Sequence, residues 1–398
     1  MAYVAVSGGE EAIAASLDLL HRQLKSPDGA VRIETIVAAL PELVDQVMGE
    51  SSLYDPGLAA LALIQGGGSV EEAVFLLRAF RSTLERPYVS RTIETSTMHT
   101  SRRISAAFKD IPGGQILGIT RDYSHRLLDF SLSETAEDRG DKVAYAEDLR
   151  DDARLAGDKG DDARPTYQPL AFEGLPKLTA YLADQGLFSP PAFDETLPHD
   201  ITMEALSFPA PRSIRLQALS RGMTQAVMAL GYAAIRGFGP AHPTVGELRF
   251  GMLDILIDHP FLAGGEDDAY YVGRIAVTEV ESLFTVENPS AAVFNGQGSH
   301  SLEFGMGYGL VYGQSESKAI AMSVLDFCLS LGDPKYPTQD EEFVLYHIDG
   351  IEATGFISHL KLPHYVTFQS KLSSARRTRG ELSQAAPQNS EESHAEAV

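Results

Sequence analysis

The chain is poor in cysteine and tryptophan. One cysteine, Cys328, occurs among 398 residues, so a single chain can form neither an internal disulfide framework nor a thiolate metal cluster. Cys328 lies in the apolar, helically patterned segment AIAMSVLDFCLSL, which indicates a buried and inert thiol. Tryptophan is absent, which removes one base-stacking side chain, but 15 tyrosines and 18 phenylalanines remain.

Long apolar runs and basic clusters are missing as well. No window approaches the ~18 consecutive apolar residues that a membrane span requires, and the N-terminus lacks the features of a secretory signal. We therefore expect a cytoplasmic protein that does not bind membranes. With a net charge of −23 and no Lys/Arg cluster with interleaved aromatics, nucleic acid should not bind either. A phosphate site must rely on backbone N–H groups, Mg²⁺ and a few arginines.

The apolar share of 44% is sufficient for a substantial core, and its pattern changes along the chain. Residues 1–86 are predicted to be a helical N-terminal region, and residues 87–133 to contain a hairpin around Pro112-Gly113-Gly114. Helix boundaries are indicated by Asp55-Pro56, by a capping box of Ser69 and Glu72, and by Gly66-Gly67-Gly68. The expected helices here are residues 10–24, a helix that starts after Asp55 and stops at Gly66, and a helix that starts after Ser69.

The second half alternates between helical and extended patterns. Residues 166–375 are predicted to form a mixed α/β body with a mainly antiparallel sheet, so the fold class is α+β. Residues 134–165, in which DDAR occurs twice, predict an acidic disordered insert, and residues 376–398 predict a disordered tail. The expected helices of the body are 178–186, 213–236 and 315–331, and its expected strands are 247–258, 268–286 and 301–313.

Eight segments, spread over nearly the whole chain, carry a family resemblance. They are YVAVSGGEEAI at the start, LAALAL (58–63), EEAVFLLRAFRSTL (71–84), RRISAAFKDIPGGQILG (102–118), DYSHRLLDF (122–130), RGFGPAHPTVGELRFGMLDI (236–255), GYGLVYGQSE (307–316) and QDEEFVLYHIDGIEATGFISHLKLPHYVTFQ (339–369). Together they resemble the PhnI family, the I subunit of the bacterial carbon–phosphorus lyase core complex.

The resemblance implies a reaction and a set of partners. The family acts with G, H and L subunits to displace adenine from MgATP with a phosphonate, which gives ribose 1-phosphonate 5-triphosphate. Alone, the I subunit hydrolyses the same bond in ATP or GTP. In a core assembly with two copies each of the G, H, I and J subunits, two histidines of the S-H-L-K-L-P-H block bind zinc at the contact with the J subunit. Those histidines correspond to His359 and His364.

The chain also departs from the family pattern and leaves other functions open. Positions that are commonly basic in the family are here Ser7, Ile64, Met306 and Ser317, which lowers the positive charge expected for a triphosphate site. The alternatives to a catalytic subunit are a mainly structural subunit of the assembly, with catalysis at interfaces, and a divergent stand-alone nucleosidase-like paralogue.

Cleavage of a ribose–purine bond indicates which residue types to look for. The oxocarbenium-like transition state needs a proton donor for the purine and a carboxylate near C1′. An incoming phosphonate oxygen is already anionic and needs no strong general base. Carboxylates occur beside histidines in two blocks, and each of them has a surface or structural role as the alternative. The candidates are Asp122 and Asp129 with His125, and Asp340, Glu341 and Glu342 with His347.

The chain lacks a G-x-x-x-x-G-K-[ST] loop. Two glycine-containing segments are therefore the candidates for phosphate binding. Gly113 and Gly114, flanked by Arg102, Arg103 and Lys109, could form an anion nest or a simple hairpin with charged flanks. The stretch Gly305-Met306-Gly307-Tyr308-Gly309 does not fit G-x-G-x-x-G. Its lack of bulk favours a strand that passes close to another backbone, with phosphate contact as the alternative.

The spacing of His359 and His364 does not by itself indicate a metal site. Five positions rotate two side chains by about 140° on a helix and place them on opposite faces of a strand. A bend is therefore needed to bring both imidazoles to one ion, and Pro363 can produce it. Two ligands leave a tetrahedral zinc site open for a partner chain, water or substrate. Lys361, between them, is a candidate phosphate ligand or a solvated lysine.

Overall fold

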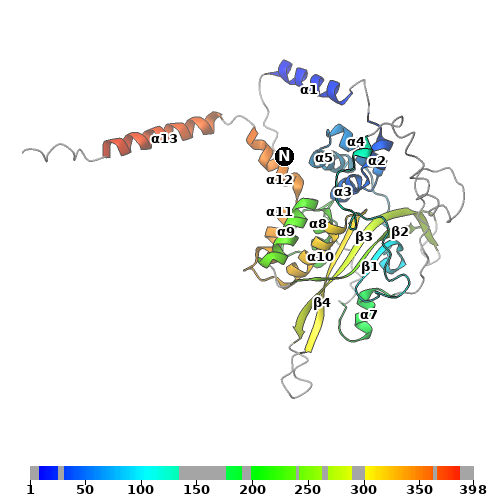
Figure 1. Cartoon of the computed structure of the whole chain (residues 1–398). Coiled ribbons are helices and arrows are strands. Elements are labelled where there is room, and N and C mark those ends of the chain that lie inside the picture. Colours follow the sequence, from blue (N-terminus) through cyan, green and yellow to red (C-terminus); the bar gives the residue numbers. More distant parts are fainter. Residues whose placement is uncertain are drawn as a thin grey trace, which may run out of the picture.

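The computed structural model describes residues 9–25, 31–133, 176–190, 199–238, 242–261, 268–288, 301–361 and 365–385. The acidic insert predicted for 134–165 lies outside these residues. Among the residues described, no helix combines the length and the hydropathy that crossing a membrane requires. Figure 1 shows helical N-terminal elements beside a twisted antiparallel sheet, with further helices against the sheet. The predicted α+β class is confirmed.

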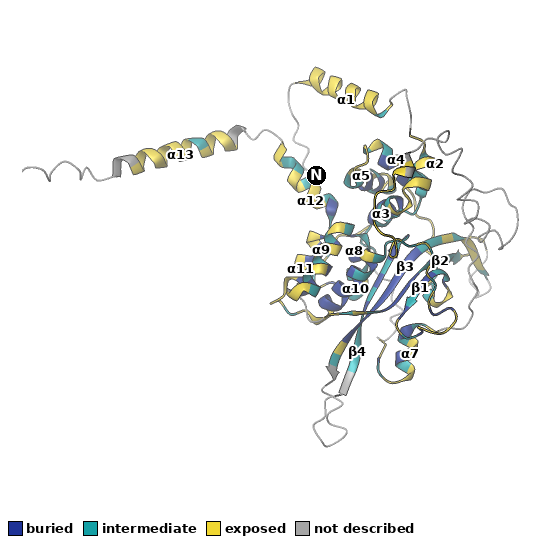
Figure 2. Ribbon diagram, in the orientation of Figure 1, coloured by how far each residue is buried: buried dark blue, intermediate teal, exposed yellow. Residues whose placement is uncertain are grey.

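The N-terminal region is helical, as predicted, and most of it shares one apolar core. Asp55 caps α4 by accepting a hydrogen bond from the Leu58 N–H at 2.9 Å, and the Ser69 hydroxyl caps α5 through the Glu72 N–H at 3.3 Å. Val47, Ala59 and Val74 are buried in the core that α3, α4 and α5 form. Residues of α1 are almost all exposed (Figure 2). These helices are α1 (Glu10–Leu24), α2 (Ile33–Ala39), α3 (Pro41–Ser51), α4 (Pro56–Gln65) and α5 (Val70–Arg81).

The sheet has four strands in the order β1-β2-β3-β4, and every neighbouring pair is antiparallel. The strands are β1 (His99–Ser105), β2 (Thr244–Asp258), β3 (Ala269–Asn288) and β4 (Ser301–Tyr312). The predicted hairpin at Pro112-Gly113-Gly114 is smaller than expected. Its turn is present, with the Gly114 N–H donated to the Ile111 carbonyl at 2.9 Å. Its second arm is a single bridge between Arg103 and Ile116, while β1 pairs along its length with β2.

Helices of the body cover the sheet, and α10 (Glu316–Leu331) is the most buried of them. Leu248 of β2, Val280 of β3 and Val311 of β4 form the main core with Met322 and Leu325 of α10. The other helices of the body and of the C-terminal segment are α7 (Leu178–Asp184), α8 (Arg212–Arg221), α9 (Thr224–Ala233), α11 (Glu341–His347), α12 (Gly350–Ser358) and α13 (Tyr365–Ala385). Short 3₁₀ turns occur at Thr95–Thr97, Phe130–Ser133, Pro337–Gln339 and His359–Lys361, and a π-helical turn at Ala234–Phe238.

Two boundary predictions differ from the structure. The single helix expected over 213–236 is divided into α8 and α9, because Gly222 has extended backbone angles (φ −58°, ψ 154°) and packs against Val227 and Ile348. Helix α13 continues through Ala385, past the expected start of the disordered tail at 376. Residues 386–398 lie outside the described part of the chain.

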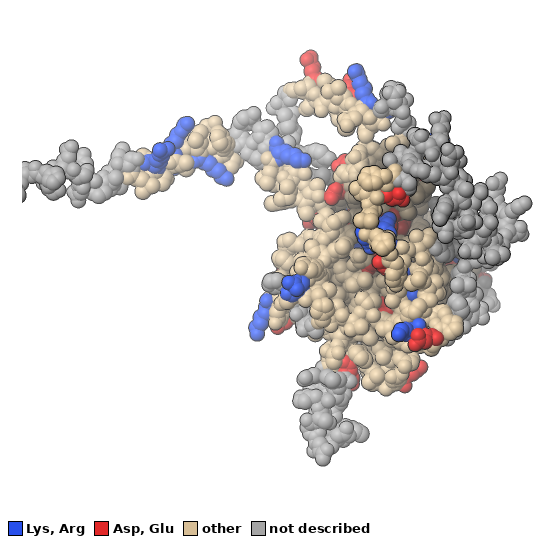
Figure 3. Space-filling view, viewed as in Figure 1, with Lys and Arg blue, Asp and Glu red and all other residues tan. Residues whose placement is uncertain are grey.

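The C-terminal helices lead away from the body. Figure 1 shows α13 projecting from it, and Figure 3 shows Lys and Arg side chains gathered along this helix. The exposed apolar side chains Phe356, Ile357 and Leu360 lie at the end of α12 and in the turn that follows it.

Cys328 is buried in α10, as predicted. Its side chain belongs to an apolar cluster with Phe284 and Phe327. Burial raises the pKa of the Cys328 thiol to about 12, so the thiolate required for nucleophilic or metal chemistry is not formed at neutral pH.

Alternate glycines of β4 allow the strand to lie directly on α10. A Cβ at Gly307 would overlap the backbone carbonyl of Ser323, and one at Gly309 would overlap that of Ala319. A Cβ at Gly305 would overlap the Phe327 ring. The predicted close approach of this strand to another backbone is therefore confirmed, and the space beside these glycines is occupied by α10.

We expect Gly307→Ala to lower the free energy of unfolding by about 1–3 kcal/mol, the usual cost of overpacking a core. The added methyl group would have to displace the backbone of α10, which cannot yield as a flexible side chain does. Urea denaturation measures the effect. Gly380→Ala in α13, where no neighbouring atom lies within 4 Å, is the matched control and should be neutral or slightly stabilising. Equal stability of both variants would contradict the close packing.

Candidate functional site

The face of the sheet that points away from α10 carries a buried, charge-balanced network. Lys177 Nζ lies 2.8 Å from both Glu279 Oε1 and Glu281 Oε1. Arg103 Nη2 lies 2.9 Å from Glu247 Oε1, and Arg249 pairs with Glu279. Three acids face three bases, and the pairing offsets the cost of burying these charges. The offset is incomplete at Glu247, where burial outweighs Arg103 and Arg249 and raises the pKa of the carboxyl. The network also holds α7, because Glu247 accepts from the Leu178 N–H and Glu281 accepts from the Thr179 N–H.

Glu279 organises the centre of this network. Its Oε1 accepts hydrogen bonds from the hydroxyls of Thr95 at 2.6 Å and Tyr308 at 2.9 Å. Burial alone would raise the pKa of the Glu279 carboxyl, but Arg249 and Lys177 lower it to about 2. Burial and the neighbouring Glu279 raise the pKa of the Tyr308 hydroxyl well above its usual value. Glu279 is therefore a permanent carboxylate that fixes the orientation of Thr95 and Tyr308.

Thr95 and Tyr308 also line a cavity of about 540 Å³ along the edge strand β4. Its walls are mainly apolar and include Ile93, Leu253 and Ile275. Other hydroxyl-bearing residues from α8 complete the lining. Among the residues that line it, Arg221 is the one charged side chain and there is no carboxylate. The volume and this mixture of apolar walls with a few polar groups are those of a small-molecule site.

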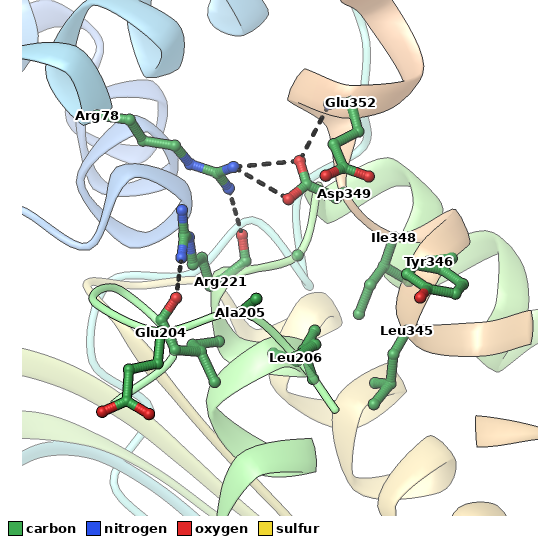
Figure 4. A pocket seen from close by; sticks show the side chains of 13 residues that line it. Arg78, Glu204, Ala205, Leu206, Arg221, Leu345, Tyr346, Ile348, Asp349 and Glu352 are labelled. Atoms are coloured by element: carbon green, nitrogen blue, oxygen red, sulfur yellow. Dashed lines mark hydrogen bonds and ion pairs between the residues drawn. The ribbon is translucent and has the colours of Figure 1, made fainter. Parts of the chain in front are cut away.

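A second cavity, of about 330 Å³, adjoins the first (Figure 4). It lies between α5, the end of α8, the segment around Ile201 and the start of α12. Arg78 crosses it and donates to both carboxylate oxygens of Asp349, at 3.1 and 3.2 Å. Arg78 also donates to the Glu50 carbonyl. Burial acts to raise the pKa of Asp349, but Arg78 and the N–H groups of α12 lower it overall.

Arg221 and Ile201 line both cavities. The Arg221 Nη1 donates to the Ile201 carbonyl at 3.0 Å, and its Nε is buried without a hydrogen-bond partner among the described residues. No carboxylate of a described residue forms an ion pair with Arg221. Burial, with the nearby cations Arg78 and Arg81, lowers the pKa of the Arg221 guanidinium to about 10. Asp349 and Asp200 oppose this shift only in part, and Arg221 forms no ion pair with either of them.

The arginines predicted to bind substrate, Arg102 and Arg103, have protein partners in this structure. Arg102 is buried, and it donates to Glu316 Oε1 at 2.6 Å, to Asp122 Oδ2 at 2.6 Å and to the Leu117 carbonyl at 2.5 Å. Arg103 belongs to the buried network with Glu247.

The turn beside these arginines is packed rather than open. Gly113 and Gly114 are buried, and a Cβ at Gly114 would overlap Phe108. The Gly114 N–H is used within the turn. Lys109 is exposed at the surface beside it. The structure thus supports the hairpin interpretation of this turn more than the anion nest.

The predicted catalytic carboxylates lie apart from both cavities. Asp340 caps α11 by accepting from the Phe343 N–H at 2.9 Å, and Glu341 accepts from the Ala210 N–H at 3.1 Å. Glu342 is exposed on the same helix. His347, at the other end of α11, bonds the Phe343 carbonyl of its own helix. In the other block, Asp122 pairs with Arg102, while His125 and Asp129 are exposed. The structure does not bring the two blocks together.

The histidine block leaves α12 through the 3₁₀ turn at His359–Lys361. A ring nitrogen of His359 contacts the Phe356 carbonyl, and both His359 and Lys361 are exposed. His364 lies outside the described residues. Within residues that the structure describes, no three histidine, cysteine or acidic side chains are placed to hold a metal ion. Pro363, where the bend is expected, also lies outside the described residues.

The four positions that are basic in the family have different surroundings here. Met306 packs against the apolar cluster that contains Leu178 and Leu283. Ile64 is half-buried and Ser317 is exposed, while Ser7 lies outside the described residues. None of the three described positions lines either cavity.

The protein is α+β, it has a cavity of the size and lining that small-molecule sites have, and its sequence contains no Walker loop. A family model described as bacterial phosphonate metabolism protein (PhnI) matches residues 2–382. The chain therefore belongs to the PhnI family of bacterial phosphonate metabolism proteins, which confirms the resemblance found in the sequence.

Three relatives each match 95% of the chain. It is 40% identical over 392 residues to "Alpha-D-ribose 1-methylphosphonate 5-triphosphate synthase subunit PhnI" of Rhizobium meliloti (strain 1021), which covers 95% of each chain. Identity to the protein of the same name from Escherichia coli (strain K12) is 41% over 387 residues, 95% of this chain and 99% of that one. The chain is also 40% identical over 386 residues to "Putative C-P lyase subunit protein HtxH" of Stutzerimonas stutzeri, which covers 95% of this chain and 96% of that one.

We expect Arg102→Ala to lower the free energy of unfolding by about 3 kcal/mol, since it removes one partner of a buried ion pair. Asp122→Asn should cost less than about 1 kcal/mol, because Asp122 is half-exposed and Arg102 keeps Glu316. Urea denaturation of both variants measures this difference. An Arg102→Ala protein of unchanged stability that binds substrate poorly would instead support the predicted substrate contact.

Lys318 of α10 generates a prediction for pH dependence. It is almost completely buried, and its Nζ donates to the Ser220 carbonyl at 2.7 Å beside the larger cavity. Burial lowers the pKa of Lys318 to about 8 from an ordinary 10.5. Between these values the unfolded chain binds more protons than the folded one, so the contribution of Lys318 to stability rises with pH.

The free energy of unfolding of the wild type minus that of Lys318→Met should therefore increase by about 1 kcal/mol from pH 7 to pH 9. Parallel urea titrations at both pH values measure it, and other titrating groups cancel in the difference. A difference that stays constant or falls would show that Lys318 is not a desolvated ammonium.

Proposed function

We propose that this chain is the I subunit of a carbon–phosphorus lyase system. It acts with G, H and L subunits to displace the purine base of MgATP with an alkylphosphonate, which gives ribose 1-phosphonate 5-triphosphate. Alone, it cleaves the purine–ribose bond of a nucleotide. The observation that carries the proposal is the match over 95% of the chain to relatives named as subunits of ribose 1-methylphosphonate 5-triphosphate synthase. The enzyme class is a cytoplasmic transferase.

The reaction needs a donor for the departing purine and a carboxylate near C1′. The proposed groups remain His125 with Asp122 and Asp129, and Asp340 with Glu341 and Glu342. Most of them are exposed on the described surface, which is consistent with a centre completed by partner subunits. Asp122, Asp340 and Glu341 also have structural partners. For them a structural role is the simpler account, and it favours the alternative of a mainly structural subunit.

The metal proposal concerns the contact with the J subunit. His359 and His364 supply two ligands for zinc, and the partner, water or substrate supplies the others. If the His359 Nδ1–H donates to the Phe356 carbonyl, the other ring nitrogen, Nε2, is the one that faces a metal. Phe356, Ile357 and Leu360, which surround His359 in sequence, have exposed fractions of 72, 65 and 62%. An apolar surface of this kind beside a metal ligand is suited to cover by another chain.

We expect the assembled complex to release adenine from MgATP when an alkylphosphonate is present, and the isolated chain to release it by hydrolysis. His359→Ala should remove zinc from the complex and abolish carbon–phosphorus cleavage. It should leave adenine release by the isolated chain within about twofold of wild type. Metal analysis, chromatography of free adenine and gas chromatography of alkane are the measurements.

His21→Ala, at an exposed position of α1, is the control and should change none of these quantities. Equal zinc in wild type and His359→Ala would exclude the metal site. Loss of adenine release in His359→Ala would place this histidine in the nucleoside-cleaving centre. If the assembled complex cleaves phosphonates normally but the isolated chain never releases adenine, the mainly structural role of this subunit would be favoured.

A further inference from the structure

The larger cavity has the chemistry of a nucleoside site. Apolar side chains from β2, β3 and β4 form its walls, and the Tyr312 ring is among them. Thr95 and Tyr308 line one side of it, and both hydroxyls donate to Glu279, so what each can offer a ligand is a remaining acceptor lone pair of its oxygen. A purine can pack against apolar and aromatic walls while its ribose meets a few hydroxyls. A cavity of about 540 Å³ is also far larger than the methyl group of a small phosphonate requires.

Arg221 stands at the end of this cavity where the smaller one begins. It comes from the last turn of α8, and its buried Nε lacks a partner among the described residues. Arg78 also lines the smaller cavity, but unlike Arg221 it already pairs with a carboxylate, that of Asp349 (Figure 4). The neighbourhood of Arg221 thus combines an unmatched cation with an opening on both sides. A phosphorus oxyanion would supply the missing charge and accept the unused N–H.

The charges of the smaller cavity limit where that oxyanion can lie. Glu204, Asp349 and Glu352 line it together with the two arginines. These carboxylates would repel a bare phosphate chain that entered deeply, so the first phosphate belongs at the junction beside Arg221. A triphosphate that carries its Mg²⁺ can extend further, because the ion offsets its charge.

From this geometry we propose that the two adjoining cavities bind a purine nucleotide, with the nucleoside in the larger cavity and a phosphate group on Arg221. The assignment rests on the proposed function for its substrate class, and it adds the place and the contacts. Arg221 is a binding residue for the phosphate. Thr95 and Tyr308 are the polar contacts offered to the nucleoside.

Two variants separate the two halves of the site. Arg221→Gln should weaken MgATP binding by the full chain at least tenfold, but weaken adenosine binding less than threefold, since adenosine has no phosphate. Ser213→Trp should weaken both ligands at least tenfold. Ser213 lies on α8 in the lining of the larger cavity and is itself exposed, so the larger ring fills the space without disturbing the core. Titration calorimetry measures both affinities, and circular dichroism confirms that each variant is folded.

Arg86→Gln is the matched control. Arg86 lies close enough to Arg81 to affect its pKa, but it pairs with Asp200 at the surface and lines neither cavity. MgATP should therefore bind this variant within about twofold of wild type. Equal MgATP affinity of wild type, Arg221→Gln and Ser213→Trp would overturn the site. Binding of methylphosphonate in the absence of nucleotide, lost in Arg221→Gln while MgATP binding persists, would also overturn it.

Adenine release by the assembled complex distinguishes failure of the site from failure of the proposed function. If the complex releases adenine but the Arg221→Gln and Ser213→Trp complexes do so with an unchanged KM for MgATP, the function stands and this site is wrong. If no complex releases adenine and the wild-type chain binds no nucleotide, both fail.

Discussion

The compensation of buried charge on one face of the sheet is the constraint on which the cleft depends. Glu247, Glu279 and Glu281 could not remain ionised in the interior without Arg103, Arg249 and Lys177, since an unpaired buried carboxylate costs several kcal/mol. These cations come from β1, β2 and the residues before α7, so the pairing also fixes those segments on the sheet. Through Glu279 the same network sets the hydroxyls of Thr95 and Tyr308, which form part of the cavity wall. Because acids outnumber bases in a chain of net charge −23, the positions of these three cations decide which carboxylates can be buried as ions.

The two faces of the sheet solve different packing problems, and β3 displays both. Glu279 and Glu281 point to the ionic face, while Val280 between them packs in the main core with α10. On the α10 side, the absence of side chains at Gly307 and Gly309 allows strand and helix backbones to touch. This close packing leaves no room for a ligand between Gly305–Gly309 and α10. The cavity lies instead at the edge of β4, where α8 rather than another strand is the neighbour, and residues of both faces line it, with Tyr308 from the ionic face and Met322 from α10.

Local signals in the sequence were sufficient for the elements but not for the site. The caps at Asp55 and Ser69 are formed as predicted, and the glycine spacing of β4 indicated its close contact. The break at Gly222 was missed because it depends on contacts with Ile348, far along the chain. The same limitation applies to the cleft. Arg78 and Asp349 are separated by 271 residues, and no local motif links them to each other or to Arg221.

The arginines illustrate why proximity in sequence does not reveal which cations already have protein partners. Arg102 stands beside a glycine turn, which suggested a phosphate contact, yet Glu316 and Asp122 raise the pKa of its guanidinium despite the opposing effect of burial. Arg249 has a raised pKa for the same reason, since Glu279 outweighs the cost of burial. At Arg221 burial and neighbouring cations prevail, and the pKa falls to about 10. Arg102 and Arg249 pair with protein carboxylates and hold the fold together. Arg221 forms no ion pair with a described residue, and it is the cation that the proposed site assigns to a phosphate group.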